Sequence, residues 1–199
     1  MNIRRTVYGY ARLKRVLDIV AVLVLLLPMF PVLIACAVAV KLGSPGPVLF
    51  RQLRLGEGEV PFRILKFRTM RVESGRIAAQ TFGHSEGVTR EGRVLRRLKL
   101  DELPQLLNVL QGHMSLVGPR PSLPELAETL PGWARHRYSV PPGLTGLAQT
   151  NGNVALDWET RCTYDVRYIA TRSLRLDLAI LLRTLIVIPL GEARFVRRR

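Results

Sequence analysis

One segment constrains the fold of this chain more than any other, an uncharged run of 22 residues from Ile19 to Val40. As an α-helix rising about 1.5 Å per residue, it is long enough to cross a hydrocarbon core of roughly 30 Å. Pro28 and Pro31 interrupt the run near its centre. Each proline removes a backbone donor and clashes with the preceding turn, so we expect a sharp bend there.

Basic residues flank this run on both sides. The positive-inside rule therefore favours keeping both of its ends on the cytoplasmic side. A broken helix that enters and leaves on one membrane face satisfies the prolines and the charges, provided that the freed backbone groups find partners in the bend. We therefore predict a monotopic, re-entrant hairpin rather than a spanning helix. The flanking cations are Arg4, Arg5, Arg12, Lys14 and Arg15 before the run, and Lys41, Arg51, Arg54 and Arg63 after it.

A cleaved leader is the main alternative for this segment. The basic start and Ala37-Val38-Ala39 resemble a secretory signal, and the residues 33–36 resemble a lipoprotein box. Such short matches arise easily in apolar, Ala-rich sequence. The run is also long for a signal, contains prolines and is followed at once by Lys41 and a basic region. We favour a retained membrane segment, with a spanning helix as the second possibility.

The charge balance of the chain favours anionic partners. Thirty Lys and Arg against fifteen Asp and Glu give a net charge of +15, which suits phospholipid head groups, nucleic acid or phosphorylated substrates. Charge alone does not choose among these classes. Cys36 and Cys162 lie in unrelated contexts and predict no disulfide framework, in keeping with a reducing compartment.

The rest of the chain predicts short strands followed by helices. Residues 43–47 form a turn cluster of Gly, Ser and Pro, and Gly56 and Gly58 divide residues 48–70 into two extended pieces. Residues 73–87 lack apolar periodicity and indicate a mobile connector, and residues 112–121 indicate a loop. The segment 178–190 is short and contains Arg183, so it suits the membrane interface better than crossing. The predicted helices are residues 93–98, 101–110, 124–138, about 156–170, and 174–190.

The acidic pair Asp101-Glu102 is the first candidate for chemistry. Pro104 follows closely, and because proline is tolerated in a first helical turn, both acids are expected at a helix N-terminus. There the helix dipole favours the ionised carboxylate. An isolated pair of this kind is most simply a helix cap. The cations just before it would either neutralise the acids or hold an anionic substrate beside them; they are Arg93, Arg96, Arg97 and Lys99.

A carboxylate attacks phosphorus only where cations and a metal screen the phosphate charge, so the second acid could hold that metal. Arg120 lies between Pro119 and Pro121, which restrict the backbone and favour presentation of its guanidinium, although an ordinary surface turn explains it too. His113 has no local partner and indicates a solvated or packing histidine. There is no phosphate-binding P-loop, dinucleotide fingerprint or hydrolase nucleophile elbow.

Several ordered motifs carry a family resemblance along almost the whole chain. They are KRVLDIV, SPGPVLFRQLRLG, FRILKFRTM, LDELPQLLNVLQG, MSLVGPRP, PPGLTGLAQTNG and YDVRYIATRSLRLDLAILLRTL. In these motifs the chain resembles the bacterial sugar transferases, specifically the monotopic phosphoglycosyl transferases. The resemblance implies an α/β, mostly helical monotopic membrane protein, with a re-entrant helix over residues 1–42 and a cytoplasmic or interfacial catalytic domain over residues 43–199.

The resemblance also implies a reaction and its residues. Asp101 matches the nucleophile that attacks the β-phosphate of a UDP-sugar, releasing UMP and leaving a sugar phosphate on the carboxylate. Undecaprenyl phosphate would then take the sugar phosphate from that aspartyl intermediate. Glu102, beside Asp101, matches the acid that binds Mg²⁺, and Lys66, Arg96 and Arg120 match basic positions suited to phosphate contact.

The same resemblance implies a place and partners. We expect the cytoplasmic face of a bacterial inner membrane, an anionic phospholipid surface, a possible homodimer and no nucleic acid. The reaction would be the first membrane step in assembling a capsule, exopolysaccharide, O-antigen or glycoprotein glycan, by a protein like the minimal catalytic form of the family. The competing class is a non-enzymatic basic membrane protein that binds anionic lipid or nucleic acid.

Three positions depart from the family pattern. The Ser that usually precedes the bend proline, here Pro31, is Phe30, so a hydroxyl that could satisfy a freed carbonyl is missing. The family's Gly-Asp is replaced at His113, and its Asn-Gly-Arg ends in Asn153. These changes leave the acidic pair intact but can alter the bend geometry and the contacts to the sugar or nucleotide.

Overall fold

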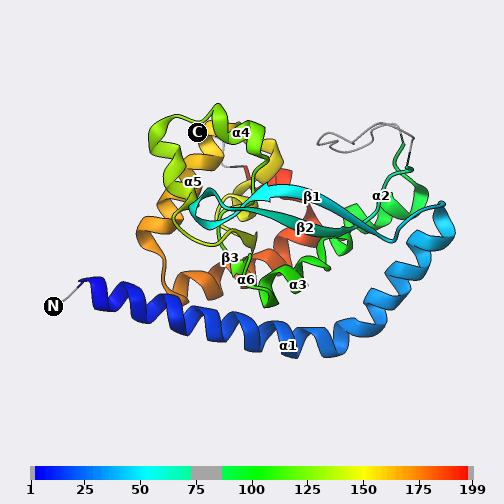
Figure 1. Cartoon of the computed structure of the whole chain (residues 1–199), viewed down its shortest axis with the longest axis horizontal. Helices are drawn as coiled ribbons and strands as arrows, with labels where there is room; N and C mark the ends of the chain where they lie inside the picture. Colours follow the sequence, from blue (N-terminus) through cyan, green and yellow to red (C-terminus); the bar gives the residue numbers. More distant parts are fainter. Residues whose placement is uncertain (1–2, 73–86, 197–199) are drawn as a thin grey trace.

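The computed structural model describes residues 3–72 and 87–196, with side chains from Tyr10 onward, so most of the expected connector lies outside the described residues. In this part the fold is mostly helical with short strands, as predicted (Figure 1). The helices are α1 Ile3–Gly43, α2 Arg90–Arg97, α3 Gln105–Leu110, α4 Pro124–Glu128, α5 Trp158–Thr171 and α6 Leu174–Leu190. The strands are β1 Leu49–Leu55, β2 Pro61–Phe67, β3 Ser115–Val117 and β4 Gly143–Thr145.

The long apolar helix α1 runs unbroken through Pro28 and Pro31 and curves along one side of the molecule (Figure 1). The expected break is therefore a bend within one continuous helix. Among the described residues, α1 is the one helix long and apolar enough to cross a membrane, over Tyr10–Gly43. Only 11% of its most apolar window is buried within the chain, so α1 is not a core helix. Its re-entrant path through a bilayer stays a prediction.

Two arginines tie α1 to the rest of the fold. Arg15 donates to the carbonyls of Val109 and Leu110, the latter at 3.0 Å, and so caps the C-terminus of α3. Arg68, at the end of β2, donates to the carbonyl oxygens of Ser44 at 2.7 Å and Pro45 at 2.9 Å, where α1 ends. The helix is thereby fixed against the body of the molecule at Arg15 and at its C-terminal end.

The strands form two small sheets. β1 and β2 pair antiparallel from Leu49 opposite Phe67 to Leu55 opposite Pro61, which confirms the two predicted extended pieces. β3 and β4 pair in parallel, so the expected loop over residues 112–121 in fact contains a strand. A Cβ on Gly143 would lie 2.0 Å from the Gly118 nitrogen, and only glycine allows the two backbones to approach so closely.

The connection between β3 and β4 also corrects the sequence reading. The single helix expected over residues 124–138 is α4 followed by a separate 3-10 helix, Gly132–Tyr138. Pro131 lies between them with an extended backbone. A proline has no amide hydrogen to donate and hinders continuation of the preceding helix, which explains the division.

The main apolar core joins elements from both halves of the chain. Its buried side chains come from α1, β2, α3, β3, α5 and α6. A second cluster lies under Cys36 and Val40 of α1, where Phe67 and Leu95 pack. Because α1 contributes side chains to both clusters, the predicted membrane helix also packs against the rest of the domain along one face.

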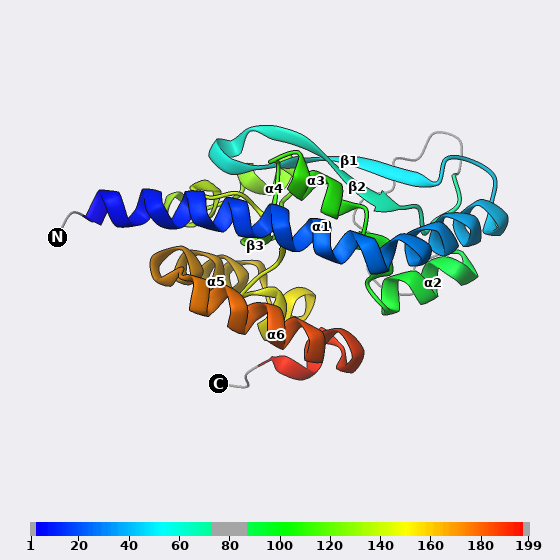
Figure 2. The same cartoon turned by 90° about the horizontal axis from the view of Figure 1, so that it is seen from below.

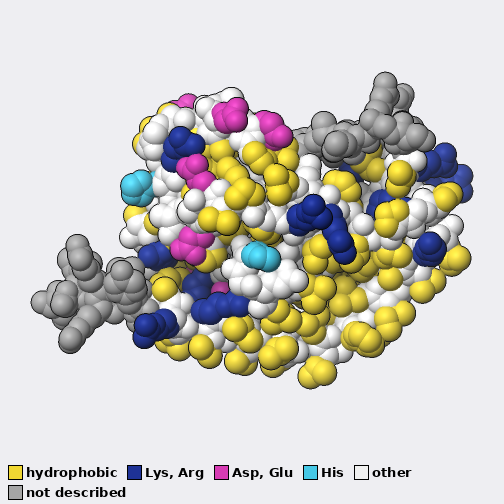
Figure 3. All heavy atoms as spheres, viewed as in Figure 1, with side chains coloured by type: hydrophobic (Ala, Val, Ile, Leu, Met, Phe, Trp, Pro, Cys, Tyr) yellow, Lys and Arg dark blue, Asp and Glu magenta, His cyan; other side chains and the backbone are white. Residues whose placement is uncertain are grey.

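The outer faces of α1 and α6 remain apolar and exposed. Viewed from below, the two helices lie side by side (Figure 2), and the edge formed by α1 is almost continuously hydrophobic (Figure 3). Leu27 is 78% exposed on α1 and Leu185 is 70% exposed on α6. We call this surface the apolar underside; it consists of Leu13, Val16, Val20, Leu23, Val24, Leu27, Phe30, Ile34, Val38, Leu178, Leu182, Leu185 and Ile186. An apolar surface of this extent marks a contact with a membrane or a partner.

Candidate active site

A cleft of about 1120 Å³ opens between the β1–β2 hairpin, α2 and the loop after β3. Its lining is strongly basic, with twelve cations and three acids. The acids are Asp101, Glu102 and Asp165, and the cations are Arg51, Arg54, Lys66, Arg68, Arg71, Arg93, Arg96, Arg97, Lys99, Arg120, Arg137 and Arg161. A concave site with this balance is suited to an anion such as a phosphorylated ligand.

The backbone at Lys99 turns the acidic pair into the cleft. α2 ends at Arg97, and Lys99 adopts a left-handed conformation with a φ of 56°, which is costly for a residue with a Cβ. The chain then forms the 3-10 helix Leu100–Glu102, followed by Pro104 and α3. The acids were expected at the N-terminus of one helix over residues 101–110; they lie instead in a short 3-10 helix that directly precedes α3.

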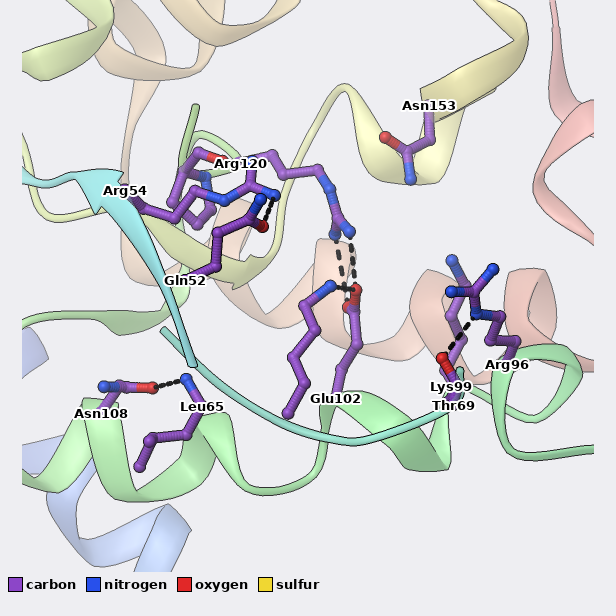
Figure 4. Close-up of polar contacts among 12 residues, drawn as sticks. Gln52, Arg54, Leu65, Thr69, Arg96, Lys99, Glu102, Asn108, Arg120 and Asn153 are labelled. Atoms are coloured by element: carbon purple, nitrogen blue, oxygen red, sulfur yellow. Dashed lines mark hydrogen bonds and ion pairs between the residues drawn. The ribbon is translucent and has the colours of Figure 1, made fainter. Parts of the chain in front are cut away.

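Glu102 is held by two cations from distant parts of the chain. Its Oε1 lies 2.7 Å from Lys66 Nζ on β2 and 2.6 Å from Arg120 Nη2, and Arg120 Nη1 donates to Oε2 at 3.3 Å (Figure 4). Burial opposes ionisation of Glu102, but the charges of Arg120 and Lys66 outweigh it and hold the pKa of this carboxyl well below its ordinary value. Glu102 is therefore ionised.

Asp101 is equally buried but far less satisfied. Its side chain is 8% exposed, and Oδ1 has no hydrogen-bond partner. Burial, assisted by the negative charge of Glu102, raises the pKa of Asp101 to about 6, although Lys66, Lys99 and Arg120 oppose this rise. A buried carboxylate oxygen without a donor is costly and marks a group kept available for a ligand or for chemistry.

Arg96 reaches the same cleft from α2, on the other side of Glu102 from Arg120 (Figure 4). Its Nε donates to Thr69 Oγ1 at 2.8 Å. α2 packs closely against Thr69 at Gly92, where an added Cβ would lie only 2.2 Å from the Thr69 carbonyl oxygen. The structure thus brings together all five residues expected to act in catalysis or phosphate contact.

The paired cations differ from those that local sequence suggested. The cluster on α2 precedes the acids directly, yet the ion pairs of Glu102 come from Lys66 and Arg120, which lie far away in the sequence. Lys99 pairs instead with Glu192 at 3.0 Å. Only the fold reveals which cations neutralise the acid.

Sequence reasoning also missed the support of Arg120. Arg137 is 2% exposed, pairs with Asp165 at 2.8 Å, and donates to the Arg120 carbonyl oxygen at 2.8 Å. Its guanidinium lies 4.6 Å from the centre of the Trp158 ring. Asp165 and Trp158 lie 28 and 21 positions beyond Arg137 in the numbering, so no local spacing could have indicated this arrangement.

Asp101 offers one free oxygen to a magnesium ion, whereas both oxygens of Glu102 accept from Lys66 or Arg120. In the described part of the chain, no group of three or more His, Cys, Asp or Glu side chains could hold a metal. Mg²⁺ is usually bound through one or two carboxylates together with waters and substrate phosphates. The unpaired Oδ1 of Asp101 is a carboxylate oxygen that is free to act as such a ligand. The donor set fits the ion only together with a phosphorylated ligand.

Of the three departures from the family pattern, only Asn153 lines the cleft. His113 is exposed and stacks on Phe62 with ring centres 5.7 Å apart, in keeping with the expected solvated or packing histidine. Asn153 lines the cleft and donates to Glu192 Oε2 at 2.9 Å. Phe30 is 63% exposed on α1, away from the cleft lining.

Comparisons with known proteins agree with the geometry. The family model described as "Bacterial sugar transferase" matches residues 9–190. A UDP-glucose:undecaprenyl-phosphate glucose-1-phosphate transferase of Caulobacter vibrioides is 50% identical over 182 residues, covering 86% of this chain and 67% of the relative. The Escherichia coli protein of the same name is 42% identical over 182 residues, covering 86% and 39%.

A third relative is named for a different sugar. The UDP-N-acetylgalactosamine-undecaprenyl-phosphate N-acetylgalactosaminephosphotransferase of Aeromonas hydrophila is 42% identical over 191 residues, covering 92% of this chain and 45% of the relative. The chain therefore spans less than half the length of two of these three proteins.

Proposed function

The chain belongs to the bacterial sugar transferase family, and from this premise we propose that it transfers a sugar 1-phosphate from a UDP-sugar to undecaprenyl phosphate. The observation that carries the proposal is Asp101, a buried carboxylate with an unpaired oxygen in a cation-lined cleft. The relatives' names supply the two substrate classes.

Asp101 is the nucleophile of the proposed reaction. Its oxygen forms a bond to the phosphorus that carries the sugar, and the bond from that phosphorus to the bridging oxygen breaks. The electron pair stays on the bridging oxygen, which leaves with UMP. The phosphate of undecaprenyl phosphate then attacks the same phosphorus and releases the aspartate.

The neighbouring side chains make this attack possible. A carboxylate and a diphosphate repel each other, so cations must compensate the charge that gathers in the transition state. Lys66 and Arg120, which Glu102 holds in position, supply part of this positive charge, and Arg96 supplies more from α2. Asp101 and Glu102 would hold Mg²⁺ with the substrate phosphates, and the ion would screen their negative charge.

The apolar underside supports a position of the cleft at a membrane surface. We propose that α1 and α6 insert into the cytoplasmic leaflet of a bacterial inner membrane, with α1 entering and leaving on the same face. A water-soluble nucleotide sugar and a lipid phosphate can then reach one carboxylate. The concave cleft, with its acids and cations in mutual contact, favours this enzyme over a protein that merely binds lipid or nucleic acid through an exposed basic patch.

The proposal is tested by turnover and by trapping the covalent intermediate. Purified protein in lipid nanodiscs is mixed with UDP-glucose, UDP-N-acetylgalactosamine or other UDP-sugars, with Mg²⁺ and with or without undecaprenyl phosphate. We expect sustained UMP release only with the lipid, and without it a single equivalent of UMP together with an adduct on Asp101 by mass spectrometry. An adduct on another side chain, or turnover that persists in Asp101→Asn, would refute the assignment.

The path of α1 has its own test. Single cysteines at positions 2 and 45 are labelled in sealed inverted membrane vesicles with a reagent that does not cross the bilayer. We expect both positions to react from the cytoplasmic side, whereas protection of one of them would show a spanning helix.

A further inference from the structure

Arg54 is a buried cation without a carboxylate partner. It is 7% exposed and lines the cleft from β1. Its guanidinium donates to the Pro121 carbonyl oxygen at 3.2 Å and to the Gln52 side-chain oxygen at 2.6 Å, and its Nε has no partner. Both partners are neutral, so no bond in this part of the structure offsets the buried charge. Such a charge is costly unless a counter-ion completes the site.

A second cation lies beside it. Arg120 stands between Arg54 and Glu102 (Figure 4). Burial, together with the charge of Arg120, lowers the pKa of Arg54 to about 10. Glu102 compensates Arg120 and Lys66, which leaves the Arg54 end of the group with excess positive charge. An anion between the two guanidiniums would reduce the repulsion between Arg54 and Arg120. It would also accept a hydrogen bond from the unpaired Nε of Arg54.

Four other cations of the cleft have acidic partners, whereas Arg68, also buried, donates to three backbone carbonyls and one hydroxyl where α1 ends. In the described residues, Lys66 and Arg120 pair with Glu102, Lys99 with Glu192, and Arg137 with Asp165. Arg54 shares one face of the hairpin with Lys66, because its cross-strand partner Phe62 and Lys66 are four residues apart on β2. It therefore lies in line with the acidic pair, beyond Arg120.

We propose that Arg54 binds the phosphate that stays with the nucleoside when the sugar phosphate is transferred. This inference rests on the proposed function and adds a subsite for the leaving group. The substrate diphosphate would lie with its transferred phosphorus at Asp101 and its second phosphate between Arg120 and Arg54. When the bridging bond breaks, the electron pair remains on the oxygen of the nucleoside monophosphate, and the donors of Arg54 compensate that charge.

The test compares UMP with uridine, which differ only in this phosphate. Wild-type protein, Arg54→Gln and Arg54→Lys are titrated in lipid nanodiscs with each compound by calorimetry. Loss of a charge-assisted contact should weaken UMP binding by about tenfold or more in Arg54→Gln, with uridine binding unchanged. Arg54→Lys keeps the charge and can still donate to Pro121, so its preference for UMP should lie between the two.

Arg63→Gln is the matched control. Arg63 lies on β2, is exposed and is not part of the cleft lining, so the same loss of charge there should leave both affinities unchanged. If Arg54→Gln weakens UMP and uridine in parallel, or leaves UMP unaffected, Arg54 only supports the Pro121 backbone and the inference is wrong. Failure of the proposed function would show separately, as absent UMP release in the wild type.

Discussion

Two buried groups of charged side chains carry a pair of carboxylates beside a lysine, and they differ in how those carboxylates are satisfied. One is the acidic pair of the cleft. The other, which we call the anchor cluster, joins α1 to α6 and consists of Tyr10, Lys14, Asp18, Ser115, Tyr168 and Asp177. Asp18 and Asp177 are each 6% exposed, and Asp101 and Glu102 are each 8% exposed. Burial alone therefore does not distinguish the two groups.

Every carboxylate oxygen of the anchor cluster has a partner. Asp177 Oδ1 accepts from Tyr168 at 2.8 Å, and Oδ2 accepts from Tyr10 at 2.8 Å and lies 2.9 Å from Lys14. Asp18 accepts from Ser115 at 2.7 Å. In the cleft, Glu102 is fully held but Asp101 Oδ1 has no donor. A closed network stabilises a fold, whereas an open one retains binding capacity for a ligand.

Asp101→Asn should have the largest effect on turnover of the substitutions that compare the two groups. Removing the nucleophile should lower UMP release at least about a thousandfold, the scale seen when a catalytic group is lost. Stability should not fall, since the amide removes a buried charge with an unpaired oxygen. Turnover and thermal unfolding are measured on the same preparation, and a variant that unfolds early would show that Asp101 holds the fold like its anchor counterparts.

Glu102→Gln should have the next largest effect. The variant leaves Lys66 and Arg120 without their acid, and it removes a proposed ligand of Mg²⁺. We expect turnover to fall by about a hundredfold or more, the scale of a lost electrostatic group in an active site. The Mg²⁺ concentration that gives half-maximal rate should also rise. An unchanged Mg²⁺ response would remove Glu102 from the metal site.

Asp177→Asn should lower the stability of the protein and leave its turnover unchanged, the opposite of what is expected for Asp101→Asn. It leaves Lys14 partly buried without this carboxylate and weakens two tyrosine contacts, so the free energy of unfolding should fall by about 3–5 kcal/mol. The turnover number of the protein that remains folded should stay near the wild-type value, because Asp177 is not part of the cleft lining. A large loss of turnover without loss of stability would place the anchor cluster in the mechanism.

The sequence predicted the secondary structure and the acidic pair well, because both depend on local signals. Apolar periodicity indicated α6, glycines indicated the division between β1 and β2, and Pro104 indicated the turn at the acids. α1 was expected to break, but its two prolines are accommodated within a continuous bend. β3 was missed because three residues with a non-local parallel partner carry no periodic signal of their own.

The electrostatic pairing could not be predicted from spacing. Lys66, Glu102 and Arg120 come from three different elements, and Arg54 reads as one of many cations along a basic strand. Their relation depends on where β2, α2 and the loop after β3 meet, which is a property of packing. The family resemblance named Lys66, Glu102 and Arg120 as site residues but indicated neither their mutual bonds nor Arg54.

The pH dependence of the rate offers a fourth test. The nucleophile must be ionised, and burial raises the pKa of Asp101 to about 6, so the rate should fall about tenfold per pH unit below that value. For stability the sign is opposite. The folded state holds this proton more tightly than the unfolded state between roughly pH 4 and 6, so stability falls as pH rises through that window. Asp101→Asn should reduce this fall in stability without abolishing it, because burial also raises the pKa of Asp165 to about 6. A rate that stays constant well below pH 6 would contradict the raised pKa of Asp101.

Tyr10→Phe should give the smallest change, and it tests whether the anchor cluster is redundant. The variant removes one hydrogen bond to Asp177 Oδ2, but Lys14 still pairs with that oxygen and Tyr168 still donates to the other. We expect a loss of about 1 kcal/mol, or a decrease in melting temperature of about 2–4 °C, with turnover unchanged. Tyr168→Phe should destabilise more, because it removes the one hydroxyl proton that lies between two acceptors, Asp177 Oδ1 at 2.8 Å and the Val117 carbonyl oxygen at 3.1 Å. If the two variants lose the same stability, each hydrogen bond contributes equally, and the remaining partners of Asp177 do not compensate for the loss of one.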